Sequence, residues 1–216
     1  MLREIWQSWV AVTATPQIET FEVEKARATM DKAVVSQLIA GLVSGIVTAI
    51  AVVLLMGFAF APVLLEALDR ELSSAQLQWV TSMLPVLTVV LAGGAMLLSP
   101  IGAVVSLFIF SGILLLFARI LGGTGSYTTQ TYLVSMFWAP LSIIRILFAF
   151  IPCLGSVASV LIFLYSLFPL TLALQSTHNF TTGRAVAVWA IPVGILLFLG
   201  LCLFVGMMGL AISAGE

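Results

Sequence analysis

Residues 72–118 read LSSAQLQWVTSMLPVLTVVLAGGAMLLSPIGAVVSLFIFSGILLLFA, and no charged side chain occurs in this run of 47 residues. About 20 apolar residues in a helix cross a hydrocarbon core roughly 30 Å thick, so the run is long enough for at least one membrane crossing. It lacks the alternation of polar and apolar residues that is typical of a membrane β-barrel strand. Because backbone groups in lipid must bond within their own segment, the run predicts α-helix.

The composition of the whole chain supports the same class. Of 216 residues, 62% are hydrophobic and 8% are charged, whereas a soluble domain carries about 25% charged residues. The formal net charge of −1 supplies no basic field that would attract a phosphate backbone, so a nucleic-acid partner is excluded. A soluble globular protein and a disordered chain are excluded too, which leaves a polytopic membrane protein.

Four more uncharged runs predict the remaining crossings, and Pro152 with Gly155 predicts a turn within one of them. These runs cover residues 33–65, 120–144, 146–183 and 185–215. We therefore predict an all-α fold, a polytopic integral membrane protein with a bundle of five transmembrane helices. The predicted spans are about 33–58, 101–121, 132–150, 156–175 and 185–208, within a transmembrane domain at 33–212.

Residues 80–98 are apolar too, and Ser99-Pro100 separates them from the span at 101–121. Six crossings would need a very tight turn at Ser99-Pro100, whereas five crossings leave 80–98 as an interfacial or re-entrant segment. The bias of Lys and Arg toward the cytoplasmic side favours five crossings, because six would place Arg119 and Arg184 outside. We therefore predict a cytoplasmic N-terminus, an external C-terminus and residues 66–98 on the outer side.

Residues 1–32 form a predicted cytoplasmic segment of different composition. Its first part has the spacing of an amphipathic helix lying on the membrane surface, where tryptophan is favoured. The apolar face holds Ile5, Trp6, Trp9 and Val10, and the residues expected to face away are Arg3, Glu4, Gln7 and Ser8. Thr15-Pro16 ends this helix, and a mixed-charge stretch leads into the first span.

Residues suited to catalysis or metal binding are scarce. No carboxylate lies inside a predicted span, His178 is the single histidine, and the two cysteines, Cys153 and Cys202, lack metal-ligand spacing. Residues 122–126 (GGTGS) resemble a phosphate loop, but they follow a helix and no Lys comes after them. We predict a protein that is not an enzyme, with no catalytic, cofactor-binding or metal site.

Polar residues within the spans leave two alternatives open. Arg145 either binds an anionic headgroup or a partner subunit, or extends to the outer interface. Pro140 and Pro169 would kink their helices, and broken helices mark the substrate site of some transporters. The nearby hydroxyl groups belong to Ser135, Ser142, Ser166 and Thr171. A permease or transport-associated subunit for a small or lipophilic solute is therefore the alternative function.

The first predicted span contains a GxxxG pattern at Gly41 and Gly45. Such a pattern allows two helix backbones to approach closely. The sequence leaves open whether the pattern serves packing inside the chain or a dimer face.

Several short motifs occur in order along the second half of the chain. They are Ala118-Arg119-Ile120-Leu121-Gly122-Gly123, Gly125-Ser126-Tyr127, Ala139-Pro140-Leu141, Ile151-Pro152 to Gly155, and His178 to Ala185. In these motifs the chain resembles the Yip domain family, the Ypt/Rab-GTPase-interacting proteins and their prokaryotic relatives. The resemblance implies five membrane-spanning helices with a cytoplasmic N-terminus, which agrees with the charge argument.

The resemblance also implies a function without catalysis, with a role related to membrane organisation or trafficking. We expect a scaffold or accessory subunit of a larger membrane complex, in a bacterial or archaeal cytoplasmic membrane. The long N-terminal region of the eukaryotic members is missing, so a Rab-type GTPase is not expected as partner. The expected partners are the lipid bilayer and other membrane proteins, a second copy of the chain included.

Three segments are predicted to meet as a partner site on the cytoplasmic side, namely residues 121–130, residues 175–184 and the helix with both tryptophans. The candidate residues are Trp6, Trp9, Gly122, Gly123, Tyr127, His178 and Arg184. The alternative is that the glycines only permit tight turns and that His178 and Arg184 only anchor to headgroups.

Overall fold

A computed structural model describes residues 1–151 and 153–213, with side chains up to residue 208. The described residues are helical with short connections, and five helical segments are long and apolar enough to cross a membrane. The predicted all-α fold class and its five membrane-spanning helices are therefore confirmed. Pro152, which was expected in the turn before Gly155, lies outside the described residues.

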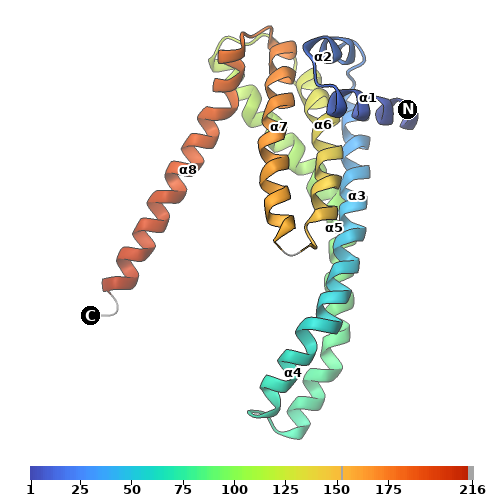
Figure 1. Ribbon diagram of the computed structural model, residues 1–216, viewed down its shortest axis with the longest axis vertical. Helices are drawn as coiled ribbons and strands as arrows, with labels where there is room; N and C mark the ends of the chain where they lie inside the picture. Colours follow the sequence, from blue (N-terminus) through green and yellow to red (C-terminus); the bar gives the residue numbers. More distant parts are fainter. Residues whose placement is uncertain (152, 214–216) are drawn as a thin grey trace.

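The helices form a bundle with two long extensions. Helices α3, α5, α6 and α7 lie side by side, α1 and α2 cross one end, and α8 diverges from the bundle (Figure 1). Toward the other end, α4 and the first part of α5 continue as a hairpin beyond the α6–α7 turn (Figure 1). The bounds are α1 Leu2–Ala14, α2 Ile18–Lys25, α3 Met30–Leu54, the π-helix η1 Leu55–Phe60, α4 Ala61–Asp69, α5 Ser74–Ile120, α6 Tyr127–Phe148, α7 Leu154–His178 and α8 Thr182–Ser213.

Helix α5 runs without a break through Ser99 and Pro100, so the predicted separation of residues 80–98 from the span at 101–121 is wrong. Proline is tolerated inside a membrane helix when neighbouring groups compensate for the lost backbone bond. Helix α3 packs closely against this part of α5. A Cβ atom on Gly41 would lie 2.5 Å from the Pro100 Cα, and one on Gly45 would lie 3.0 Å from the Ala95 carbonyl oxygen.

The GxxxG pattern therefore serves packing within the chain. The 47 residues of α5 span about 70 Å, more than twice the roughly 30 Å of a hydrocarbon core.

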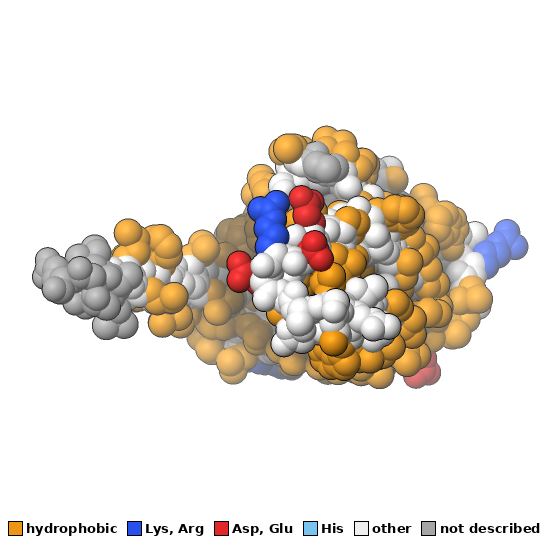
Figure 2. All heavy atoms as spheres, turned by 90° about the horizontal axis from the view of Figure 1, so that it is seen from below, with side chains coloured by type: hydrophobic (Ala, Val, Ile, Leu, Met, Phe, Trp, Pro, Cys, Tyr) orange, Lys and Arg blue, Asp and Glu red, His pale blue; other side chains and the backbone are white. Residues whose placement is uncertain are grey.

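The surface around the α4–α5 turn is largely hydrophobic, with a few charged side chains gathered on it (Figure 2). The sequence places Glu66, Asp69, Arg70 and Glu71 at this turn.

The N-terminal segment differs from its predicted pattern in two ways. Helix α1 buries Ser8 together with Ile5, Trp9 and Val12, so the expectation that Ser8 faces away is wrong. Trp6, from the predicted apolar face, does not pack into the bundle and is 64% exposed. The mixed-charge stretch contains a further helix, α2, which buries Phe21 and Glu24 and was not predicted.

The core lies in the half of the bundle that α1 and α2 cover. Helix α6 is central, because every side chain from Gln130 to Phe137 is buried. Phe21 from α2, Leu114 from α5 and Leu174 from α7 are each at most 1% exposed in the same cluster. Helix α6 therefore provides the fixed surface to which the polar side chains of this end attach.

Candidate functional site

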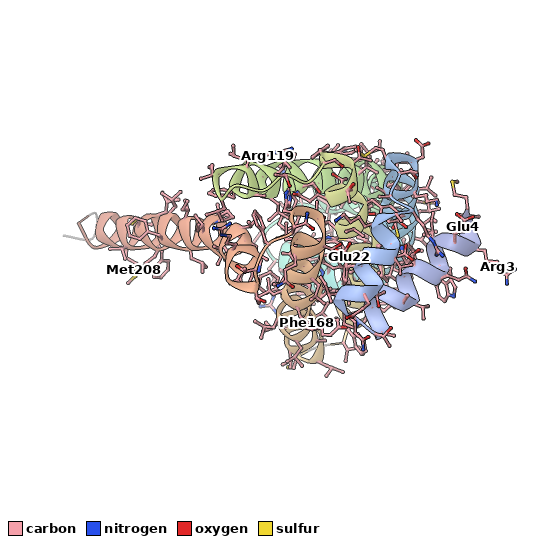
Figure 3. The ribbon with its side chains drawn as sticks, turned by 90° about the horizontal axis from the view of Figure 1, so that it is seen from above. Arg3, Glu4, Glu22, Arg119, Phe168 and Met208 are labelled. Carbon is pink, nitrogen blue, oxygen red and sulfur yellow. The ribbon has the colours of Figure 1, made fainter. Side chains whose placement is uncertain are left out.

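The polar side chains with long-range contacts gather at one end of the bundle. We call it the capped end, and it consists of residues 1–29, 121–130 and 175–184. Figure 3 looks onto this end and shows α1 and α2 lying over one side of the bundle, while α8 extends away on the other. Of the three segments predicted to meet, 121–130 and 175–184 contact each other directly. Helix α1 instead contacts α2, α3 and α6, and Tyr165 in the middle of α7.

His178 links both connecting loops to the bundle. The Gly125 amide donates a hydrogen bond to its Nδ1 at 3.0 Å, and Nε2 lies 2.8 Å from Oε1 of Gln130. Since Nδ1 must accept, Nε2 carries the proton and donates, which makes the ring neutral. Gln130 Nε2 donates in turn to the Ser111 carbonyl at 2.7 Å. This chain of hydrogen bonds ties α5, α6 and α7 together around a side chain that is 3% exposed.

The loop after α5 is shaped by its glycines and by Arg119. Gly122 has φ +84°, a backbone conformation that side-chain-bearing residues rarely adopt. A Cβ on Gly123 would lie 2.6 Å from the imidazole Nδ1 of His178, and one on Gly125 would overlap Thr177. The Arg119 guanidinium donates to the carbonyls of Gly123 and Gly125 at 3.1 and 2.9 Å. These contacts give the glycine-rich motif a structural role.

A buried carboxylate attaches the N-terminal segment to the bundle. Glu24 is 4% exposed, and its Oε2 accepts hydrogen bonds from the Ser8 hydroxyl at 2.7 Å and from the Tyr132 hydroxyl at 2.8 Å. The Arg27 guanidinium lies 3.6 Å from Oε1. A buried charge is costly unless it is paired and hydrogen-bonded, and these groups meet that requirement. Glu24 therefore connects α1, α2 and α6 at one point.

Two further polar contacts fix the same segment. The Trp9 indole N–H donates to Ser36 Oγ at 2.8 Å, and Ser36 donates to the Ser135 carbonyl at 3.3 Å. The Lys25 ammonium donates to the Ser176 carbonyl at 2.6 Å, near the end of α7. Helices α1 and α2 are thus bonded to α3, α6 and α7 and form an integral part of the capped end.

The predicted partner-binding residues fall into two groups. Trp9, Gly123 and His178 are buried, and Tyr127 is half-buried with its hydroxyl donating to the Phe108 carbonyl at 3.0 Å. The accessible residues of the set are Trp6, Gly122 and Arg184.

Sequence reasoning missed Ser8, Glu24, Lys25, Gln130 and Tyr132. The spacing 5, 8, 9, 12 in α1 is that of one helical face, which could have indicated that Ser8 is buried.

The hydroxyl groups near the intramembrane prolines donate within their own helices, and the Thr171 hydroxyl also accepts from the Trp189 indole N–H of α8 at 3.0 Å. Each donates to a carbonyl three or four residues earlier, at 2.6–2.8 Å, and the residues are Ser135, Ser142, Ser166 and Thr171. A cavity of about 30 Å³, the volume of one or two water molecules, lies between Ser142, Arg145 and Ser166. Cys153 and Cys202 are exposed free thiols. Among the described residues, no three His, Cys, Asp or Glu side chains cluster as metal ligands.

An open groove of about 700 Å³ lies beside the capped end, and we call it the α2–α7 groove. Glu19 and Glu22 line it from α2, while Phe168, Leu172 and Gln175 line it from α7. Phe168 is 53% exposed, and Figure 3 shows Glu22 and Phe168 on the side of the bundle away from Arg119. The groove therefore joins an acidic rim to an apolar wall.

Comparison with known proteins gives one family. The family model described as Yip1 domain matches residues 39–204, from the middle of α3 into the second half of α8. This range contains the motifs from Ala118 to Ala185, whereas α1 and α2, with the family-like Thr15-Pro16 and Phe21, lie outside it. Comparisons with curated proteins and with solved structures gave no match.

Proposed function

This chain belongs to the Yip1 domain family, and from that premise we propose that it is a non-enzymatic scaffold or accessory subunit that binds other proteins of its membrane. The observation that carries the proposal is the capped end. Glu24 is hydrogen-bonded to Ser8 and His178 to the Gly125 amide, which supports a fixed surface, and Trp6, Gly122 and Arg184 remain exposed on it.

The proposed location is a bacterial or archaeal cytoplasmic membrane with the capped end in the cytoplasm. Lys25, Arg27, Arg119 and Arg184 all belong to this end or adjoin it, whereas the α4–α5 turn carries three acidic residues and one Arg. Basic residues favour the cytoplasmic side of a membrane protein. With α1 beside the ends of the spans, the exposed Trp6 lies where an interfacial tryptophan is favoured.

The alternative function, a permease, has less support. A transport path needs polar groups that are free to face solute or water. The four hydroxyl groups near Pro140 and Pro169 donate instead to carbonyls of their own helices. The cavity beside Arg145 holds only one or two water molecules. These contacts favour packing between helices.

Affinity recovery in a mild detergent, followed by mass spectrometry of the co-purified membrane proteins, tests the proposal. The variant Trp6→Ala/Arg184→Ala removes two exposed side chains of the capped end, and Trp79→Ala/Arg70→Ala removes the same residue types near the α4–α5 turn. Because Trp and Arg are frequent anchors of interfaces, we expect the first variant to lower partner recovery by about tenfold. The second variant should match wild type. Equal recovery with both variants would contradict a partner site at the capped end.

A further inference from the structure

Helix α8 leaves most of its apolar surface uncovered. Every described residue from Gly194 to Met208 is exposed, and the large apolar side chains from Ile195 onward are 48–71% exposed. Because these residues are consecutive in a helix, they face all directions. Figure 1 shows α8 diverging from α7 along its length. Within the described part of the chain, little packs against the second half of α8.

The first half of α8 carries one exposed charge in line with apolar side chains. Arg184 is exposed and takes part in no ion pair within the described residues. Ile191 and Ile195 follow it after 7 and 11 residues, close to two and three helical turns, so the three side chains share one stripe. Ile191 and Ile195 are 41% and 48% exposed. The stripe is basic at the capped end and apolar farther along α8.

The α2–α7 groove complements this stripe, because it is acidic at the capped end and apolar farther along α7. Its rim at the capped end holds the exposed carboxylates of Glu19 and Glu22. The nearest cation to Glu22 is Lys25 at 3.6 Å, and that ammonium already donates to the Ser176 carbonyl. Phe168 lies ten residues before His178, about 15 Å along α7 from the rim. Ile191 and Ile195 lie about 10 and 16 Å along α8 from Arg184, at the depth of the apolar wall.

We propose that the α2–α7 groove of one copy receives helix α8 of a second copy, with Arg184 against Glu19 and Glu22 and with Ile191 and Ile195 against Phe168 and Leu172. Copies in one membrane share their orientation, so the neighbour's α8 also runs away from the capped end, as the groove does. The α8 of the same copy departs on another side of the bundle, away from Glu22 and Phe168 (Figure 3).

The charges favour this occupant over a lipid. An acyl chain could cover Phe168 and Leu172, but the two carboxylates repel an anionic headgroup and attract a guanidinium. The contact uses different surfaces of the two copies, so it forms a ring or a chain, or closes a dimer when it is made twice. This self-association goes beyond the proposed scaffold function and does not depend on any other partner.

Disulfide cross-linking in native membranes tests the contact. All variants carry Cys153→Ser and Cys202→Ser. Phe168→Cys in one tagged copy and Ile195→Cys in a second, differently tagged copy lie at the same depth and should form a disulfide between copies upon mild oxidation. Ile109→Cys is the matched control, because this exposed residue of α5 lies 11 residues from the end of its helix and thus at a similar depth. It should not cross-link to Phe168→Cys.

Charge reversal then tests the ion pair. We expect Glu22→Lys or Arg184→Glu alone to lower the cross-linking yield by about threefold to fivefold, and the combination to restore it. All these side chains are exposed, so folding should be unaffected. A yield no higher than with Ile109→Cys, charge variants without effect, or a monomer that retains a stoichiometric lipid in native mass spectrometry would each overturn the proposal. Arg184 also belongs to the proposed partner surface, so Glu22→Lys separates the two proposals: it should lower cross-linking and leave the recovery of other membrane proteins at the wild-type level.

Discussion

The Tyr132 hydroxyl donates a hydrogen bond to the Glu24 carboxylate at 2.8 Å, across 108 positions of the sequence. Glu24 belongs to α2, which lies outside the residues matched by the family model, and Tyr132 belongs to the central helix of the matched domain. The pair therefore attaches the N-terminal segment to the membrane domain. With Ser8 as a second donor, the buried carboxylate fixes α1 as well.

Removing either donor should loosen the N-terminal segment. Tyr132→Phe leaves Glu24 buried with one neutral donor, which costs about 1–3 kcal/mol of local stability. We expect trypsin to cleave after Lys25 and Arg27 faster than in wild type, because both peptide bonds lie in the loosened segment. Tyr127→Phe is the control, since it removes the hydroxyl of another α6 tyrosine, which donates to the Phe108 carbonyl and not to the N-terminal segment, and it should leave cleavage unchanged. Equal rates for wild type and Tyr132→Phe would show that the hydrogen bond does not hold the segment.

We expect the buried His178 side chain to stabilise the fold. Its replacement by Ala leaves the Gly125 amide and the Gln130 Oε1 atom without their His178 partner, and each lost partner costs about 1–3 kcal/mol. We expect a lower thermal midpoint and aggregation in size-exclusion chromatography. Arg184→Ala, at an exposed position of the same region, should keep the wild-type midpoint. A stable, monodisperse His178→Ala protein would contradict this role.

The close contact between α3 and α5 should not tolerate a side chain in place of Gly41. A Cβ there would meet the backbone of Pro100 and Ser99 at 2.5 and 2.8 Å, so Gly41→Leu must separate the two helices. Overpacking typically costs about 1–3 kcal/mol, and backbone neighbours cannot move aside as a side chain can. Gly93→Leu in α5 is the control because nothing lies within 4 Å of a Cβ at that position. Thermal unfolding in detergent should show a much lower midpoint for Gly41→Leu and an unchanged midpoint for Gly93→Leu.

The contact between α1 and α3 should depend on pH. The Lys32 ammonium lies 3.1 Å from Glu4, and its hydrogen bond and charge hold the pKa of this carboxyl below the ordinary value of 4.5. A lowered pKa in the folded state means that the stabilisation is complete above pH 4.5 and is lost as the pH falls through the folded-state pKa. The difference in thermal midpoint between wild type and Glu4→Gln should therefore be small at neutral pH and vanish in acid. A difference that grows in acid would contradict the pairing.

The membrane-spanning helices could be predicted because they depend on composition alone. Uncharged runs indicate where the chain can lie in lipid, and the GxxxG pattern indicated a close helix contact. The sequence did not reveal that Pro100 continues a helix, because that depends on the α3 backbone packed against it.

The capped end was only partly predictable. The sequence pointed to the loops around Gly123 and His178, but polarity misled the assignment of Ser8, and the burial of Glu24 was not predicted. Polar residues are expected to face water, and these two are buried because each satisfies the other. Such pairing depends on residues far apart in the chain, so no local pattern reports it.

The most direct test of the central claim, that the capped end of a five-span membrane protein faces the cytoplasm, is labelling of single cysteines in intact cells. In a Cys153→Ser/Cys202→Ser background, Ser126→Cys and Thr182→Cys report the capped end, and Ser73→Cys reports the α4–α5 turn; all three positions are exposed. We predict that a membrane-impermeant maleimide labels only Ser73→Cys until the cells are opened. Labelling of Ser126→Cys and Thr182→Cys in intact cells would contradict the orientation, and labelling of only one of these two would contradict five crossings.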